Sequence, residues 1–256
     1  MHKSVFAAAV SAALAVPTLV TAQAPAPAAS PVTGNLSIVS DYRFRGLTQT
    51  MERPALQGGF DYAHSSGFYL GNWNSNVSSA IFPNANLEMD FYGGYKRSFG
   101  DVGLDIGFLY YYYPGSRATL TNLQSGTTAT DTKIDNKEVY LGASWKWLSL
   151  KYFHSIDDFF AVPDTKNSWY LDSQATFDLG AGWGVVGHIG RQKVKGFSDA
   201  SYTDYKLGVT KDIGGFVFGA AYVDTNAKGS AWTYADARKS MNIGDSGVVL
   251  SVSKTF

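Results

Sequence analysis

From residue 34 to the end of the chain, hydrophobic and polar positions alternate with a period of two. Within residues 102–112, for example, Leu104 and Ile106 alternate with Asp105 and Gly107. This period is typical of β-strands that have one apolar and one polar face. Eight segments show it clearly: 36–45, 56–62, 87–96, 101–112, 138–146, 149–155, 169–177 and 204–210. Four more are strand-like but less regular, at 67–77, 182–192, 214–224 and 246–256, so the pattern predicts twelve strands.

The links between these segments alternate strictly between short and long. Short links fall at 64–67, 98–101, 146–148, 178–182 and 212–215, and long links at 46–54, 78–85, 114–136, 157–167, 193–201 and 225–245. Bacterial outer-membrane barrels have short periplasmic turns and longer external loops. With twelve strands, the N-terminus and the C-terminus of the barrel chain both lie on the periplasmic side, so all six long links are expected outside the cell. Two of them, 114–136 and 225–245, are long enough to fold inward and narrow a pore.

The composition agrees with a membrane barrel. Aromatic residues make up 15% of the chain and glycines number 27, yet the mean hydropathy is only −0.11. A strand that faces lipid on one side and water on the other gives such an average. Strands of about ten residues cross a bilayer when tilted, and closure leaves no unpaired sheet edge in hydrocarbon. The predicted fold is therefore an all-β, antiparallel, up-and-down transmembrane β-barrel of about 12 strands.

The N-terminus has the layout of a cleaved export signal. Lys3 precedes an apolar, small-residue stretch over 5–20, and Ala22 offers a cleavage site. An uncleaved anchor is the alternative, but the stretch is short for a membrane span. We therefore expect a signal peptide over 1–22, a flexible Ala/Pro-rich entry segment over 23–33 and an outer-membrane β-barrel over 34–256, in a Gram-negative bacterium.

Charge and residue usage exclude several classes of function. With 21 basic and 21 acidic residues, no nucleic-acid surface is indicated. There is no cysteine to form a disulfide or a thiolate site. His64, His154 and His188 lack metal-ligand spacing, so neither a metal nor another cofactor is expected. His154 near Asp157 and Asp158 is a weak hint of a barrel protease, and a solvated strand end explains it better. We expect no enzyme and no catalytic residues.

The strongest candidate site is Asp41 with Arg43 and Arg45, which share the polar face of the first predicted strand. One interpretation is a charged patch that lines the lumen. The other is a structural network that bonds to facing carboxylates such as Asp61 and Glu88, because small barrels fill their interiors with side chains. The full set of candidate pore-lining residues is Asp41, Arg43, Arg45, Gln57, Asp61, Glu88, Asp90, Lys96, Asp105, Lys146, Lys151, Asp172, Asp204 and Lys206. Their mixed signs indicate no ion preference.

Three segments carry a resemblance to a known family. Residues 40–46, Ser-Asp-Tyr-Arg-Phe-Arg-Gly, are followed by Thr-Gln-Thr at 48–50, and Pro-Ala-Leu-Gln-Gly-Gly-Phe-Asp-Tyr occupies 54–62. The chain closes on Ser-Lys-Thr-Phe at 253–256. Over the whole mature chain, and most specifically over 34–77, the sequence resembles the TorF family of porin-like proteins of Proteobacteria. The resemblance implies an outer-membrane barrel and a porin role, and it supplies no catalytic residue or cofactor.

These observations predict a porin-like channel for passive diffusion of small polar solutes or ions. The alternative is a non-conducting surface barrel that binds a partner or stabilises the envelope through its external loops. Expected partners are outer-membrane lipid, the solutes themselves and the barrel-assembly machinery, which would read the last strand ending at Phe256. Lys254 stands where an aromatic residue is usual in that signal. A homo-oligomer is compatible with the sequence, but no interface can be identified from it.

Overall fold

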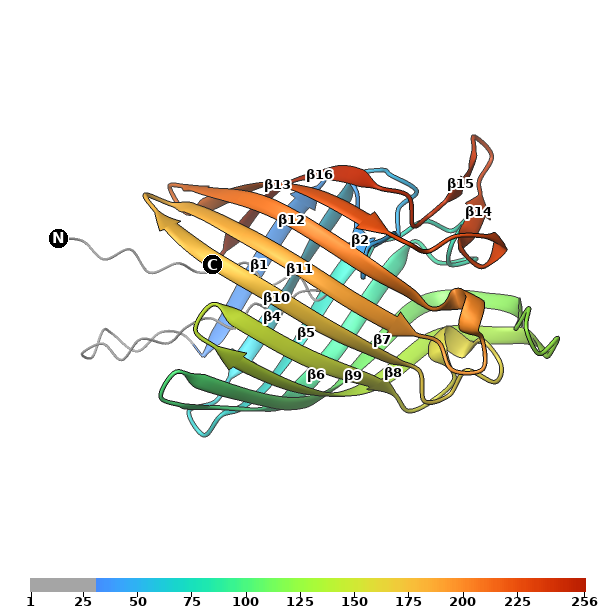
Figure 1. Cartoon of the computed structure of the whole chain (residues 1–256), viewed down its shortest axis with the longest axis horizontal. Helices are drawn as coiled ribbons and strands as arrows, with labels where there is room; N and C mark the ends of the chain where they lie inside the picture. Colours follow the sequence, from blue (N-terminus) through green and yellow to red (C-terminus); the bar gives the residue numbers. More distant parts are fainter. Residues whose placement is uncertain (1–30) are drawn as a thin grey trace.

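The computed structural model describes residues 31–256, and its centre is a closed barrel of twelve antiparallel strands (Figure 1). The barrel strands are β1 (Val32–Val39), β4 (Ala55–Ala63), β5 (Phe68–Asn76), β6 (Leu87–Phe99), β7 (Val102–Thr121), β8 (Thr128–Trp145), β9 (Leu148–Ser155), β10 (Trp169–Gly180), β11 (Trp183–Lys193), β12 (Tyr202–Ile213), β13 (Phe216–Thr225) and β16 (Gly247–Thr255). The predicted fold class and strand number are confirmed. The expected signal peptide and most of the entry segment lie outside the described residues.

Each strand pairs with its neighbours in the chain, and the ring closes between the first and last strands. In that closing pair Leu36 lies opposite Lys254 and Ile38 opposite Val252. Short turns join the strands at one end, and longer segments join them at the other (Figure 1). The alternation of short and long links read from the sequence is therefore present in the fold. Within residues 31–256, no helix is long and apolar enough to cross a membrane.

The outer wall of the barrel is apolar. Large hydrophobic side chains point outward with about half of their surface exposed or more, such as Leu141 at 59% and Leu207 at 64%. At about 25 cal/mol for each Å² of apolar surface kept from water, this wall is stable only against hydrocarbon. Aromatic side chains, among them Trp145, Trp147 and Trp183, lie at the short-turn end of the wall, as expected for an interfacial girdle.

The predicted external loop 114–136 is mostly strand. The strands β7 and β8 continue past the barrel to Thr121 and from Thr128, so only 122–127 forms a loop. This extended hairpin lies over the long-loop end, where the Asn122 side-chain amide donates to the backbone oxygens of Pro163, at 2.9 Å, and Gly196, at 3.2 Å. The hairpin therefore binds to the neighbouring loops and does not enter the pore.

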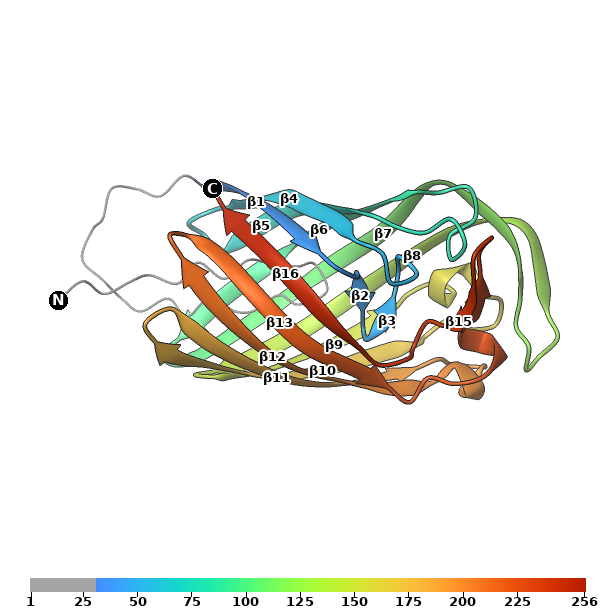
Figure 2. The same cartoon turned by 90° about the horizontal axis from the view of Figure 1, so that it is seen from above.

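The first strand is shorter than the sequence pattern predicts. β1 ends at Val39, and residues 40–54, which we call the lumen hairpin, turn into the barrel (Figure 2). The alternation over 36–45 predicts that Tyr42 and Phe44, like Leu36 and Ile38, face lipid. This prediction is wrong, because Tyr42 and Phe44 are only 4% and 7% exposed. The segment 46–54 was expected as an external loop, but its residues 46–51 are buried as well, and only Glu52 and Pro54 are exposed.

Candidate functional site in the barrel lumen

A tight turn shapes the lumen hairpin. Its short strands, β2 (Arg43–Phe44) and β3 (Leu47–Thr48), are joined by Arg45 and Gly46, whose φ angles are +47° and +83°. Positive φ at both central residues is the geometry of a type I′ turn, which favours glycine at the second position. Space imposes the same choice, because a Cβ on Gly46 would lie 2.5 Å from the Thr225 side chain.

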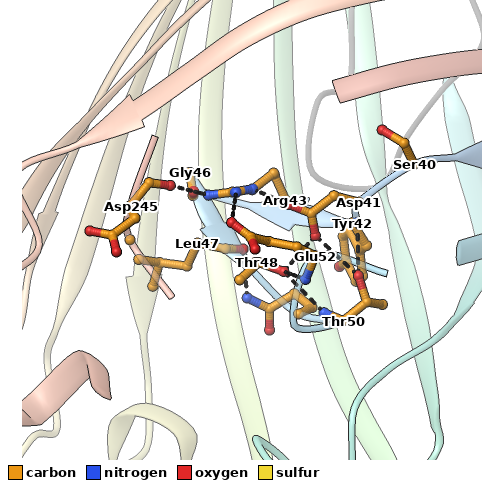
Figure 3. A network of polar contacts seen from close by, with 12 residues as sticks. Ser40, Asp41, Tyr42, Arg43, Gly46, Leu47, Thr48, Thr50, Glu52 and Asp245 are labelled. Carbon is orange, nitrogen blue, oxygen red and sulfur yellow. Dashed lines mark hydrogen bonds and ion pairs between the residues drawn. The ribbon is translucent and has the colours of Figure 1, made fainter. Parts of the chain in front are cut away.

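The base of the lumen hairpin is held by the carboxylate of Asp41 (Figure 3). It accepts hydrogen bonds from the hydroxyls of Thr48, at 2.5 Å, and Thr50, at 3.1 Å, and from Nε of Arg43, at 2.5 Å. Asp41 therefore joins both arms of the hairpin. Charge-assisted bonds of this kind are among the stronger hydrogen bonds in proteins.

Arg43 ties the lumen hairpin to the segment between β13 and β16. Its guanidinium donates to the backbone oxygen of Gly46, at 3.2 Å, and to that of Asp245, at 2.7 Å. It also lies 3.8 Å from the carboxylate of Glu52. The connecting segment contains a small hairpin, β14 (Thr233–Ala235) and β15 (Ser240–Asn242). An ion pair between Arg53 and Asp236 links the lumen hairpin to this small hairpin. Loop 225–245 therefore holds the lumen hairpin in place.

Arg45 occupies the tip of the lumen hairpin and is buried. Nη2 lies 2.6 Å from Oε2 of Glu138 on β8, and Nη1 lies 3.1 Å from Oε1, so the pair is bidentate. Nη1 also donates to Oε1 of Gln192 on β11 at 2.9 Å. The guanidinium carbon lies 4.3 Å from the ring centre of Tyr170 and 5.1 Å from that of Phe153. Arginine keeps its charge at any working pH, so this buried charge depends on Glu138.

Other hairpin side chains contact the opposite walls. The Tyr42 hydroxyl donates to Glu88 on β6 at 3.2 Å, and its ring meets Trp73 on β5 edge-on at 5.4 Å. The Phe44 ring meets Tyr111 on β7 at 5.3 Å. The lumen hairpin therefore contacts strands on several sides of the barrel and occupies the lumen at its level.

Between the lumen hairpin and the short-turn end, inward side chains are partly exposed, and we call this part of the lumen the vestibule. Asp105 keeps 25% of its side chain exposed, Lys151 16% and Asp172 13%. Lys151 pairs with Asp105 at 2.8 Å, and the Tyr92 hydroxyl donates to Asp61 at 2.5 Å. Because these side chains point inward, the surface that they expose faces lumen water.

Apart from Asp41, Arg43 and Arg45, the candidate residues occupy four kinds of position. Gln57, Glu88 and Asp90 lie on the inner wall and are buried to 3% or less. Six inward residues keep some exposure and lie along the vestibule: Asp61, Lys96, Asp105, Lys151, Asp172 and Lys206. Asp204 is inward but buried. Lys146 is in the turn after β8, 3.8 Å from Asp101, at the rim of the barrel.

Asp41, Arg43 and Arg45 are not on the first strand, which is a correction to the prediction. The two arginines also do not form one patch, because Arg43 binds hairpin and loop groups while Arg45 binds the barrel wall. Their carboxylate partners are Asp41, Glu52 and Glu138, not Asp61 or Glu88.

Sequence reasoning missed Glu138 and Gln192, which receive Arg45. Glu138 had a visible signal, since it is a lone carboxylate on the polar face of a strand whose outward face carries Val139 and Leu141. Gln192 had none, because an uncharged polar residue on an inner face is ordinary. Within residues 31–256, no group of three His, Cys, Asp or Glu side chains could hold a metal ion.

A closed, twelve-stranded, antiparallel barrel with an apolar outer wall and a polar interior defines a transmembrane β-barrel of the outer-membrane type. The chain belongs to the family described as "Bacterial protein of unknown function (Gcw_chp)", whose model matches residues 23–256. That description does not include the name TorF, which stays an expectation from the resemblance.

The fold is similar to that of solved porin structures. The chain is similar to the KdgM porin, with 8% identity and a TM-score of 0.52 over 88% of this chain and 98% of that one. The same values hold for the KdgM porin in complex with disordered oligogalacturonate. The outer membrane protein OprD from Pseudomonas aeruginosa matches with 11% identity and a TM-score of 0.41, over 89% of this chain and 65% of that one. No curated protein sequence matches the chain.

Proposed function

We propose that this barrel is a narrow porin-like channel for passive diffusion of small polar solutes or ions. The observation that carries the proposal is the vestibule, where inward charged side chains such as Asp105, Lys151 and Asp172 keep contact with lumen water. A barrel that only anchored its loops would gain nothing from solvated charges in its interior. Twelve strands also enclose more space than the eight-stranded barrels that side chains fill.

In this proposal the lumen hairpin is the constriction. It lies between the vestibule and the long-loop end and contacts the walls through Tyr42, Phe44 and Arg45. Solutes therefore pass when the hairpin shifts or through the space beside it, and both routes keep the conductance small. The porin fold shared with KdgM is compatible with this function and does not identify a solute.

One observation favours a second candidate, a non-conducting surface barrel. The Arg45 side chain is only 3% exposed and Glu138 is fully buried, so the level of the hairpin tip is filled. In that case the loops at the long-loop end would carry the function.

Planar-bilayer recording with the purified, folded protein separates the two candidates. The channel predicts discrete conductance steps, smaller than those of sixteen-stranded porins in the same salt, because fewer strands enclose a narrower lumen. Folded protein that inserts and gives no steps over long recordings would support the non-conducting barrel and refute the channel.

A further inference from the structure

A polar site lies on the inner wall where β10, β11 and β12 are adjacent. Strand register places two rows of inward positions next to each other, Asp172–Gly190–Asp204 and Gln174–His188–Lys206. Gly190 allows the Tyr170 hydroxyl and the Asp204 carboxylate to pack over its backbone, because a Cβ there would collide with both. The two rows therefore present both charge signs within one small area.

Part of this site is internally satisfied. Asp204 is buried, with its carboxylate oxygens 2.8 and 2.9 Å from the Tyr170 hydroxyl. Nε2 of His188 lies 2.9 Å from Oδ1 of Asp204. These three side chains form a fixed cluster at the back of the site.

The remaining polar groups have unused bonding capacity. Lys206 has no hydrogen bond or ion pair with any side chain among residues 31–256. Oε1 of Gln174 and Nδ1 of His188 are buried without a hydrogen-bond partner, and the side chains are 3% and 5% exposed. The nearest charged contact of Asp172 is Nδ1 of His188, at 3.6 Å, beyond hydrogen-bond range. Buried polar atoms without partners are uncommon and require an explanation.

The site lies next to the tip of the lumen hairpin and opens onto the vestibule. Gly46 at the tip approaches Asp204 so closely that a Cβ would lie 2.7 Å from the Asp204 side chain. The Arg45 guanidinium covers the Tyr170 ring. Asp172 and Lys206 keep partial exposure, so a solute that enters the vestibule can reach them.

We propose that these two rows bind a small zwitterion that carries one ammonium and one carboxylate group, as an amino acid does. Its carboxylate would accept hydrogen bonds from Lys206, and its ammonium would donate to Asp172 and to Oε1 of Gln174. The inference rests on the proposed channel only for the route of the solute, since binding itself needs no passage.

Charge complementarity selects a zwitterion over a singly charged solute. An anion at Lys206 would lie near the carboxylates of Asp172 and Asp204, and a cation at Asp172 would lie near Lys206. Each would meet a like charge in a partly buried site, where repulsion is screened less than in bulk water. A zwitterion satisfies both signs and leaves the net charge of the site unchanged.

The test is a calorimetric titration of the folded, full-length barrel in detergent with L-alanine, acetate and ethylammonium as probes. Alanine is expected to bind the wild type more tightly than either singly charged probe. Lys206→Gln and Asp172→Asn should each weaken alanine binding by about tenfold or more, since each removes a hydrogen bond to a charged group. Lys96→Gln removes another lumen lysine, near the turn end, and should leave binding unchanged.

Three results would overturn the proposal: no alanine binding to the wild type, acetate or ethylammonium binding as tightly as alanine, or equal losses in Lys206→Gln and Lys96→Gln. The comparison of the three probes uses only wild-type protein, so a variant that fails to fold does not remove the test. Alanine binding by a barrel that shows no conductance would refute the channel and support the site. Conductance without alanine binding would refute the site and support the channel.

Discussion

The ion pair between Arg45 and Glu138 offers the sharpest perturbation of the lumen hairpin. Glu138→Gln keeps the size of the side chain and one acceptor for Arg45, but it removes the only carboxylate within residues 31–256 that pairs with this guanidinium. A buried charge that loses its counterion is strongly destabilised. In this barrel Arg45 can regain water if the hairpin leaves the lumen, so we expect the hairpin to be displaced while the barrel stays folded.

The geometry sets the size of the effect. Two charge-assisted contacts, at 2.6 and 3.1 Å, join the pair, and both side chains are at most 3% exposed. Breaking a buried pair on one side costs about 3–5 kcal/mol, and the hydrogen bond retained by glutamine argues for the lower value. About 3 kcal/mol corresponds to a roughly 100-fold fall in the ratio of closed to open channels.

Open probability in planar bilayers measures this change. Lys137→Gln is the control. Lys137 lies next to Glu138 on β8, and its exposed ion pair with Asp157 is of a kind that contributes at most about 1 kcal/mol. Adding Arg45→Gln to Glu138→Gln removes the unpaired charge and should restore part of the closed state. If Glu138→Gln and Lys137→Gln give the same open probability as the wild type, the ion pair does not hold the hairpin.

Three further predictions follow from the same structure. Unheated protein from outer-membrane fractions should migrate differently in gel electrophoresis from heated protein, and recovery from soluble periplasm without detergent would contradict the barrel. Leu141→Arg on the lipid face should lower the unfolding free energy by about 2–4 kcal/mol in urea titrations, while Ser149→Arg, on the inward face of β9 near the short-turn end, should cost far less. Equal losses would contradict the assignment of Leu141 to the lipid face and Ser149 to the lumen. The backbone N–H groups of Lys239 and Arg238 lower the pKa of Asp236 to about 2. The stability that ionised Asp236 gives to loop 225–245 should therefore be complete above about pH 4 and lost as the pH falls through 2. An NMR titration of Asp236 with an ordinary carboxyl pKa would contradict this.

The barrel was predictable because its strands are regular along the sequence. Residues such as Leu104 and Asp105 differ in polarity because one meets lipid and the other meets the lumen, and this contrast is local. Turn positions follow from the same pattern. Strand number, closure and the segregation of long loops therefore required no knowledge of distant contacts.

The lumen hairpin was not predictable in the same way. Tyr42 and Phe44 continue the alternation of β1, so the sequence pattern does not mark the end of the strand at Val39. An apolar side chain that packs inside the barrel gives the same alternation in the sequence as one that faces lipid. The one local sign was the turn-forming Gly46, and the pattern alone could not show that this turn points inward. The partner of Arg45 is 93 residues away in the chain, and no local pattern contains that information.

The conductance of a barrel that lacks the lumen hairpin tests the central claim most directly. Residues 41–53 would be replaced by a short Gly/Ser linker, and folding would be checked by the gel shift on heating. The account predicts that the shortened barrel gives larger and steadier conductance steps than the wild type in the same salt, because the vestibule then opens to both sides. A folded, inserted barrel without the hairpin that conducts no better than the wild type would contradict it.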